Sequence, residues 1–368
     1  VITARVGSDK YPTVISVGAL SDLLAFSGNY TSSSALVVCD QYFQSADLSL
    51  YSELSELFKA FPTLFVSGGV ESKGLSGYQT IIEWVISKKL PRDGILIAIG
   101  GGVIGDLVAF VASTYLRGVG LVHVPTTTTS MIDSAIGGKT GLNFDSQVNS
   151  IGTYYNPNAV FMDIRFLLTL GKRDYFAGIC EAIKMSLTSS FERTQILLEC
   201  SRALSYSVKD EILLLDLIIW SVKTKLYHVS DDAKEKSIRL ILNYGHTFGQ
   251  AFETYYGLHQ DYLRHGEAVS LGMMCASTAI NILDNNEKTA MVKRLTKELL
   301  EAYELPTCIM HIGGAPPSPK TLYENLINDK KRTSKGNRFI LTPSIGDAEI
   351  RYISDDDAIL QSFAVITG

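Results

Sequence analysis

The sequence predicts an N-terminal α/β domain built on a parallel sheet and a mostly α-helical C-terminal domain. Up to residue 170, short apolar runs alternate with helical patterns, whereas from residue 171 apolar residues recur at three- and four-residue spacing. The length of 368 residues also favours two domains, because a single core seldom extends over so long a chain. We therefore expect domains at 1–170 and 171–368, with the functional site in a cleft between them.

Four apolar runs in the first domain predict strands that are buried on both faces. Each run is continuous rather than alternating and ends in Gly, Asp, Ser or Thr. Parallel sheets bind ligands at the carboxyl ends of their strands, which is where these polar residues fall. The runs are ALVVCD (35–40), TLFVSGG (63–69), GILIAIGGG (94–102) and GLVHVPTT (120–127).

The second domain has the pattern of successive helices. The segment EILLLDLIIW (211–220) is apolar nearly all round, so we expect it in the helical core. A short basic stretch at 329–338 precedes a strand-like run at 338–350. The expected helices are 175–190, 194–206, 209–229, 245–256, 266–284 and 287–303.

Composition and charge argue against several classes of protein. The formal net charge is -5, whereas surfaces that bind nucleic acid generally are basic. The five cysteines are odd in number and form no CxxC pair, which fits a reducing compartment. No apolar run reaches the roughly 18 residues that cross a bilayer, and the first residues lack the pattern of a signal peptide. We expect a cytoplasmic homodimer with no nucleic-acid or membrane partner.

Two polar segments that follow predicted strands suggest a nucleotide site. The glycines of 100–106 precede a helical pattern and would let a pyrophosphate approach the backbone and the helix N-terminus. The alternative is a tight turn in which glycines serve packing. The segment 125–129 is PTTTT, and Lys139 follows two glycines, so it is free to reach a phosphate. The alternative there is a polar loop with Asp133 as a helix cap.

Two histidines and one carboxylate are candidates for a metal site. His246 and His265 are each flanked by glycine in helical patterns, and Glu181 lies in GICEAIK. Two histidines and a carboxylate leave one position open for substrate, as in catalytic zinc sites. The spacing is not HExxH, so distant segments would have to converge. For Glu181 and Lys184 alone, which are three residues apart, a surface ion pair is the simpler interpretation.

Together these segments resemble the 3-dehydroquinate synthase family of sugar phosphate cyclases. The resemblance implies a dehydroquinate synthase-like fold with a Rossmann-like first domain, NAD and Zn²⁺ or Co²⁺ as cofactors, and a sugar phosphate as substrate. The matching stretches stand in the family order and are GGGVIGDLVAFVASTYLRG (100–118), VPTTTTSMIDSAIGGKTGLN (124–143), GICEAIK (178–184), RLILNYGHTFGQAFE (239–253) and RHGEAVSLGMM (264–274).

The resemblance also implies a role for particular residues. The implied metal ligands are Glu181, His246 and His265. The implied catalytic residues are Lys139, Lys184, Asp133, Asn243 and His246. The implied substrate contacts are Arg117, Asn149, Lys225, Arg239, Gln250 and Lys330. The implied NAD contacts are Asp40, Glu71, Lys73, Gly101, Gly102, Val103, Asp106, Thr126, Thr127, Lys139 and Thr169.

Lys225 and Arg239 bear on the choice of substrate. They match the family's lysine and arginine that hold a substrate carboxylate, fourteen residues apart. A lysine with an arginine fork suits a carboxylate, and family members whose sugar phosphate lacks one typically lose this pair. We therefore expect a carbon–oxygen lyase of the shikimate pathway that converts 3-deoxy-D-arabino-heptulosonate 7-phosphate to 3-dehydroquinate and phosphate.

Three positions depart from the family pattern and keep other functions open. Val148 replaces a common lysine, Gln250 a common histidine and Val70 a common acidic residue. Glutamine cannot change its charge near neutral pH, so a role in proton transfer is weakened there. The alternatives are a cyclase for another substrate, such as sedoheptulose 7-phosphate, in specialised metabolism, an NAD-dependent polyol dehydrogenase, and a non-catalytic homologue.

Overall fold

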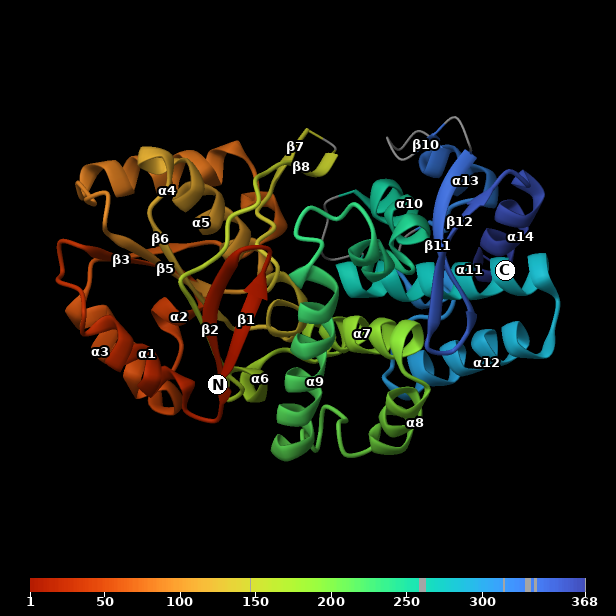
Figure 1. Cartoon of the computed structure of the whole chain (residues 1–368), viewed down its shortest axis with the longest axis horizontal. Coiled ribbons are helices and arrows are strands. Elements are labelled where there is room, and N and C mark those ends of the chain that lie inside the picture. The colour runs from red at the N-terminus through yellow and green to blue at the C-terminus, as the bar shows by residue number, and fades with distance from the viewer. Residues whose placement is uncertain (146, 258–262, 314, 328–331, 334–335, 368) are drawn as a thin grey trace. The chain divides into compact units, whose positions relative to one another are not determined.

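The computed structural model consists of two compact units and describes all residues except 146, 258–262, 314, 328–331, 334–335 and 368 (Figure 1). The first unit comprises Val1–Gly171 and Leu214–Lys234, and the second comprises Lys172–Leu213 and Glu235–Gly368. The helix α9 (Glu211–Ser230) therefore begins with residues of the second unit and continues in the first.

The first unit contains a seven-stranded sheet. Its strands are β1 (Ile2–Val6), β2 (Asp9–Ser16), β3 (Ala35–Asp40), β4 (Thr63–Val66), β5 (Ile95–Gly100), β6 (Gly120–Pro125) and β9 (Ala159–Asp163), in the order β1-β2-β9-β6-β5-β3-β4. Among the described strands of this sheet, β1 and β2 pair antiparallel and all other neighbours pair parallel. From β3 the chain passes to its neighbour β4 on one side, whereas from β5 it passes to β6 on the other side. The strand order therefore reverses between β3 and β5, and parallel sheets bind ligands at such a switch point. The four predicted strands are confirmed, but the predicted burial on both faces is wrong for β4, an edge strand whose residues are all partly exposed.

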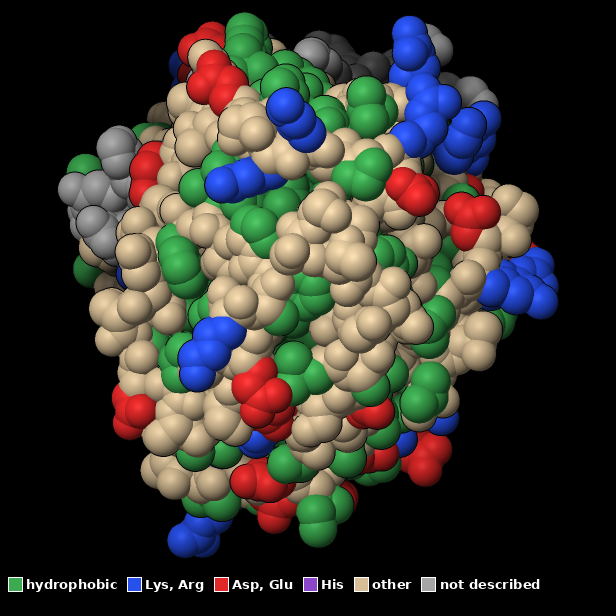
Figure 2. Space-filling model, turned by 90° about the vertical axis from the view of Figure 1, so that its left-hand side faces the viewer, with side chains coloured by type: hydrophobic (Ala, Val, Ile, Leu, Met, Phe, Trp, Pro, Cys, Tyr) green, Lys and Arg blue, Asp and Glu red, His purple; other side chains and the backbone are tan. Residues whose placement is uncertain are grey.

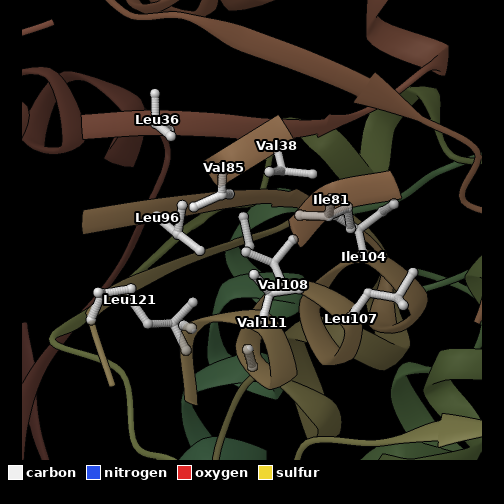
Figure 3. Close-up of a cluster of buried hydrophobic side chains, with 14 of the residues drawn as sticks. Leu36, Val38, Ile81, Val85, Leu96, Ile104, Leu107, Val108, Val111 and Leu121 are labelled. Atoms are coloured by element: carbon white, nitrogen blue, oxygen red, sulfur yellow. The ribbon is translucent and has the colours of Figure 1, made fainter. Parts of the chain in front are cut away.

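Helices cover both faces of this sheet (Figure 1). They are α1 (Ala19–Ser27), α2 (Tyr42–Ser45), α3 (Ser52–Ala60), α4 (Leu75–Ser87), α5 (Gly102–Thr114) and α6 (Phe166–Thr169), with short turns at Ser49–Tyr51, Val70–Ser72, Tyr115–Arg117 and Ser130–Ser134 and a hairpin of β7 (Leu142–Phe144) and β8 (Gln147–Ile151). On one face, apolar side chains of α4 and α5 pack against those of β3, β5 and β6 (Figure 3). This core fixes the start of α5 beside the end of β5.

The second unit is mostly helical, as predicted. Its helices are α7 (Lys172–Ser189), α8 (Phe191–Cys200), α10 (His246–Tyr256), α11 (His265–Asp284), α12 (Glu287–Ala302), α13 (Pro319–Ile327) and α14 (Asp356–Thr367), with short turns at Ile238–Asn243 and Ile309–His311. A small sheet has the order β10 (Arg332–Thr333), β11 (Gly336–Ser344) and β12 (Asp347–Ile353). The strand-like run at 338–350 is therefore a hairpin of two strands.

Hydrophobicity alone does not specify where two apolar helices, α9 and α11, are buried. Among the described residues, α11 is long and apolar enough to cross a membrane, but 83% of its apolar window is buried inside the protein, as in a core helix. The prediction that all of EILLLDLIIW lies in a helical core is wrong. Ile212 is 80% exposed, and the helix belongs to the first unit from Leu214 onward. An all-round apolar helix can bury one face and leave the other exposed.

One face of the first unit carries charges of both signs. On the face shown in Figure 2, basic and acidic side chains are interspersed with hydrophobic and other polar ones. The exposed ion pair between Arg5 and Asp231, at 2.7 Å, is one example within this unit. Pairs of this kind contribute little to stability.

Candidate functional site

Three side chains that can hold a metal ion converge in the second unit. The Nε2 atoms of His246 and His265 lie 3.7 and 3.6 Å from Oε1 of Glu181, and the three potential ligand atoms lie within 4.8 Å of one another. Glu181 is fully buried, and none of the described residues donates a hydrogen bond to its Oε1. Burying an unpartnered carboxylate oxygen is costly, so a divalent cation between the three residues fits this donor set.

Each histidine ring is held through the nitrogen that does not face Glu181. The Nδ1 of His246 lies 3.2 Å from the carbonyl oxygen of Tyr244, and the Nδ1 of His265 lies 2.8 Å from Oε1 of Glu253. A ring that donates its Nδ1–H keeps a lone pair on Nε2, which is the form that binds metals. Glu253 was not predicted from the sequence, because its position two helical turns after His246 does not indicate that it contacts His265.

Glycines allow the helices that carry these side chains to approach closely. A Cβ atom on Gly266 would lie 1.9 Å from the carbonyl oxygen of Ala177, in α7. One on Gly272 would lie 2.0 Å from the carbonyl oxygen of Gly245, which itself has a φ of 78°. The glycines beside the histidines therefore serve the contacts of α11 with α7 and α10.

Gly266→Ala is expected to lower the free energy of unfolding by about 1–3 kcal/mol, because the added methyl group overlaps backbone atoms that cannot move aside easily. Calorimetric unfolding of the metal-free protein measures this loss. Gly313→Ala is the matched control, since nothing lies within 4 Å of a Cβ atom at Gly313. Equal stability of the two variants would contradict the packing role of Gly266.

Glu181 and Lys184 form a buried ion pair. Oε2 of Glu181 contacts Nζ of Lys184, and their side chains are 0% and 2% exposed. The interpretation of this pair as a surface contact is therefore wrong, because α7 is buried along nearly its whole length from Tyr175 onward. A buried ammonium group needs a partner, and the carboxylate supplies one.

The turn before α10 carries further polar side chains. Arg239 is 1% exposed, and Nδ2 of Asn243 donates to Oε1 of Glu235 at 2.7 Å. Glu235 has a φ of 55°, in the left-handed region that non-glycine residues rarely adopt. Glu235 was not predicted from the sequence, since no pattern around it marks a strained backbone. Gln250, one turn after His246 in α10, is partly exposed.

Charged pairs fix the start of α11 against the start of α7. Nε and Nη2 of Arg173 donate to the two carboxylate oxygens of Glu267, at 2.6 and 2.7 Å. Oε2 of Glu267 also accepts the backbone N–H of Arg264, whose Nε bonds Asp174 at 2.8 Å. Bidentate arginine pairs restrict orientation, so this network helps to hold Glu181 and His265 on their respective helices.

In the first unit, predicted nucleotide contacts lie at the ends of β3, β5 and β6. A Cβ atom on Gly68 would lie 2.0 Å from Oδ2 of Asp40, and one on Gly101 would lie 3.0 Å from Cγ2 of Thr127. Burial raises the pKa of the Asp40 carboxyl, and the hydrogen bond from the Tyr42 N–H opposes this. These close approaches leave little room for larger side chains at the two glycines.

Lys73 joins two further predicted residues. Its Nζ lies 2.5 Å from Oδ2 of Asp106, in α5, and donates to Oδ1 of Asn149 at 2.6 Å, in the β7–β8 hairpin. Burial raises the pKa of Asp106, and the charge of Lys73 opposes this effect. Asn149 has a φ of 51°, and its N–H donates to Oδ1 of Asn143. Lys73 thus ties the hairpin to α5.

Lys225 pairs with Asp133. Nζ of Lys225 donates to Oδ1 of Asp133 at 2.7 Å and also to the carbonyl oxygen of Asp133. Asp133 lies inside the turn Ser130–Ser134, which is π-helical because the N–H of Ala135 bonds the carbonyl oxygen of Ser130. It is therefore not a helix cap, and turns of this kind often occur at functional sites.

The other predicted residues occupy varied surroundings. Thr126 is buried with its N–H bonded to the carbonyl oxygen of Gly100, and Thr169 bonds the Tyr51 hydroxyl at 2.7 Å. Lys330 lies outside the described residues. Five predicted residues are exposed or partly exposed: Glu71, Gly102, Val103, Arg117 and Lys139.

His123, in β6, is a buried histidine outside the predicted site. Burial lowers its pKa to about 4, so the ring is uncharged near neutral pH. A buried, uncharged ring at this position fits a structural role.

Two protein-family models match consecutive parts of the chain: 3-dehydroquinate synthase N-terminal at residues 63–177 and 3-dehydroquinate synthase C-terminal at residues 178–332. The 3-dehydroquinate synthase of Sulfurovum sp. (strain NBC37-1) is 38% identical over 297 residues, which are 79% of this chain and 79% of that protein. The 3-dehydroquinate synthase of Geotalea uraniireducens (strain Rf4) is 33% identical over 370 residues, covering 98% of both chains.

Among solved structures, 2-epi-5-epi-valiolone synthase from Streptomyces hygroscopicus subsp. jinggangensis 5008, with NAD+ and Zn2+ bound, is similar over 100% of this chain and 99% of that chain. The TM-score is 0.85 at 23% identity, which shows a common fold. The two family models match in order along the chain, and the relatives exceed 30% identity over most of their length. The chain belongs to the 3-dehydroquinate synthase family.

Proposed function

We propose that the chain is a 3-dehydroquinate synthase that converts 3-deoxy-D-arabino-heptulosonate 7-phosphate to 3-dehydroquinate and phosphate. The observation that carries this proposal is the 33% identity to a protein of that name over 98% of both chains. The proposal includes NAD and Zn²⁺ or Co²⁺ as cofactors, carbon–oxygen lyase chemistry, a cytoplasmic location and a homodimeric state.

In this proposal the N-terminal α/β domain binds NAD, and the helical C-terminal domain binds the metal and contributes to substrate binding. The closely packed glycines and carboxylates at the strand ends of the first unit support the NAD site. The buried Glu181 with two histidine Nε2 atoms facing its Oε1 supports the metal site. When bound, NAD would accept a hydride from a hydroxyl-bearing carbon of the substrate, which leaves a ketone there, and would return the hydride after phosphate has left, while the metal would polarise the oxygen on that carbon. The ketone would make the neighbouring C–H acidic enough for phosphate elimination.

The chain's own residues would bind and orient the substrate. Lys184, paired with Glu181 in a water-excluded setting, would place a positive charge beside the developing negative charge of the substrate. Glu235 accepts from the amide of Asn243 and so fixes its orientation, which would direct its oxygen to a substrate hydroxyl. Lys225 and Arg239 would bind the carboxylate, and Arg117 and Lys330 the phosphate.

Asp40→Ala is expected to weaken NAD binding roughly 10- to 100-fold, because a carboxylate that accepts hydrogen bonds from ribose hydroxyls contributes about 1.5–3 kcal/mol. Calorimetric titration of the full chain with NAD measures this change. Asp93→Ala, at an exposed aspartate before β5, is the matched control. An unchanged dissociation constant would remove Asp40 from the NAD site.

The direct test is phosphate release from 3-deoxy-D-arabino-heptulosonate 7-phosphate and from sedoheptulose 7-phosphate, with NAD and Zn²⁺ or Co²⁺ present. We expect turnover of the first substrate, formation of 3-dehydroquinate and no net NADH. Net NADH without phosphate release would instead identify a polyol dehydrogenase. No turnover of any substrate by metal-loaded protein would contradict the proposal.

A second candidate is a cyclase for sedoheptulose 7-phosphate. Gln250 and Val148, which depart from the family pattern, favour it, since both replace residues that could carry charge. Turnover of sedoheptulose 7-phosphate alone would establish this alternative. It would also mean that Lys225 and Arg239 serve something other than a substrate carboxylate.

A further inference from the structure

Glu253 is tied by geometry to the metal centre although it is not a predicted ligand. Its Oε1 lies 2.8 Å from Nδ1 of His265, while Nε2 of the same ring lies 3.6 Å from Oε1 of Glu181. We propose that Glu253 is a positioning residue that fixes the ring of His265 and thereby sets the metal affinity of the site. This inference rests on the proposed metal-dependent function.

His265 needs such a partner more than His246 does. It is the first residue of α11, and its side chain is 44% exposed, compared with 20% for His246. Packing therefore restricts the ring of His265 less than that of His246, and the hydrogen bond to Glu253 has more rotation to limit. The two rings meet edge to face with their centroids 5.2 Å apart, so a change in one orientation also affects the surroundings of the other.

The helix arrangement presents Glu253 in the required direction. Glu253 lies on α10 seven residues after His246, and this spacing puts both side chains on one face of the helix. A Cβ atom on Gly249, between them, would lie 2.8 Å from the carbonyl oxygen of Ala268, in α11. The helix that supplies one ligand thus also supplies the residue that orients another.

A carboxylate does more at this position than the carbonyl group that bonds His246. By accepting the Nδ1–H it stabilises the tautomer whose Nε2 has a free lone pair, and it increases the donor strength of the ring. It also adds negative charge next to a divalent cation. An ordinary exposed histidine–glutamate pair would leave the other ring nitrogen to solvent, whereas here that nitrogen faces the fully buried Glu181.

The test compares metal binding by the full-length wild type, Glu253→Ala, Glu253→Gln and a control. After removal of metal, each protein is titrated with Co²⁺, followed by visible absorption, and with Zn²⁺ in competition with a chelator. We expect 10- to 100-fold weaker binding and an altered Co²⁺ spectrum for Glu253→Ala. The metal affinity of Glu253→Gln should fall between those of the wild type and Glu253→Ala, since glutamine keeps an oxygen acceptor but loses the charge. The control, Glu298→Ala, removes an exposed pair with Arg294 and should bind as the wild type does.

The melting temperature of the metal-free proteins separates positioning from a structural role. We expect all four to unfold at the same temperature within experimental error. If Glu253→Ala binds Co²⁺ as tightly as the wild type, the inference is overturned. It is also overturned if Glu253→Ala is less stable than the wild type and Glu253→Gln binds metal no more tightly than Glu253→Ala does. A wild type that binds neither metal would overturn the metal-dependent function itself.

Discussion

Glu181→Gln is expected to lose both bound metal and turnover, while NAD binding is retained. Glu181 is the one carboxylate among the three converging candidate ligands, and its Oε1 faces both histidine rings. Glutamine has nearly the same shape but no charge, so the site would keep its volume and lose much of its attraction for a divalent cation. Metal content by elemental analysis should fall from about one per chain to near zero, and calorimetric titration should show unchanged NAD affinity.

The same substitution is also expected to destabilise the metal-free protein. Lys184 is 1% exposed and pairs with Glu181, so removing the carboxylate leaves a buried ammonium group without that partner. Breaking a buried pair in this way costs about 3–5 kcal/mol. The double variant Glu181→Gln/Lys184→Met should regain much of the loss, because an apolar chain replaces the ammonium group, yet it should still bind no metal.

These two measurements separate the roles of the residue. Full metal occupancy in Glu181→Gln would remove Glu181 from the ligand set. A double variant as unstable as the single one would show that the contact with Lys184 is not the source of the destabilisation. Glu192→Gln, near the start of α8 at an exposed position, is the control for both measurements.

The fold was predictable where one local signal decides the structure. β3 and β5 are continuous apolar runs, and both are buried along nearly their whole length in the sheet. The second unit's helices follow from apolar spacing for the same reason. The α9 segment was misjudged because its apolar composition indicates burial in general but does not specify which core buries it, or that Ile212 is left exposed.

The candidate site was predictable only as far as its residues stand in recognisable motifs. Glu181, His246 and His265 could be proposed as a set, and the structure brings their ligand atoms together. Their supporting contacts were not predictable, because Glu253, Glu235 and Arg173 acquire their partners only when separate segments fold against one another. The burial of Lys184 was missed for the same reason, since a spacing of three residues describes exposed and buried pairs equally well.

Lys225→Met is expected to lower kcat/KM for 3-deoxy-D-arabino-heptulosonate 7-phosphate by about 30- to 4,000-fold. Removing one of two cations that bind a carboxylate leaves it underpaired, at a cost of roughly 2–5 kcal/mol. Lys225 is 5% exposed and donates to Asp133, so methionine fills its place while leaving that carboxylate without this donor. Lys223→Met, at an exposed position two residues earlier on α9, is the matched control and should be as active as the wild type.

A general loss of binding and a specific loss of the carboxylate contact differ in how they affect a ligand without a carboxylate. The dissociation constants of 3-deoxy-D-arabino-heptulosonate 7-phosphate and sedoheptulose 7-phosphate should therefore be measured for the wild type and Lys225→Met. If Lys225 binds the carboxylate, only the first ligand loses affinity by the expected factor, because sedoheptulose 7-phosphate has no carboxylate to be left underpaired. Equal losses for both ligands would instead mean that Lys225 acts through Asp133, whose position in the turn Ser130–Ser134 would then affect every substrate alike.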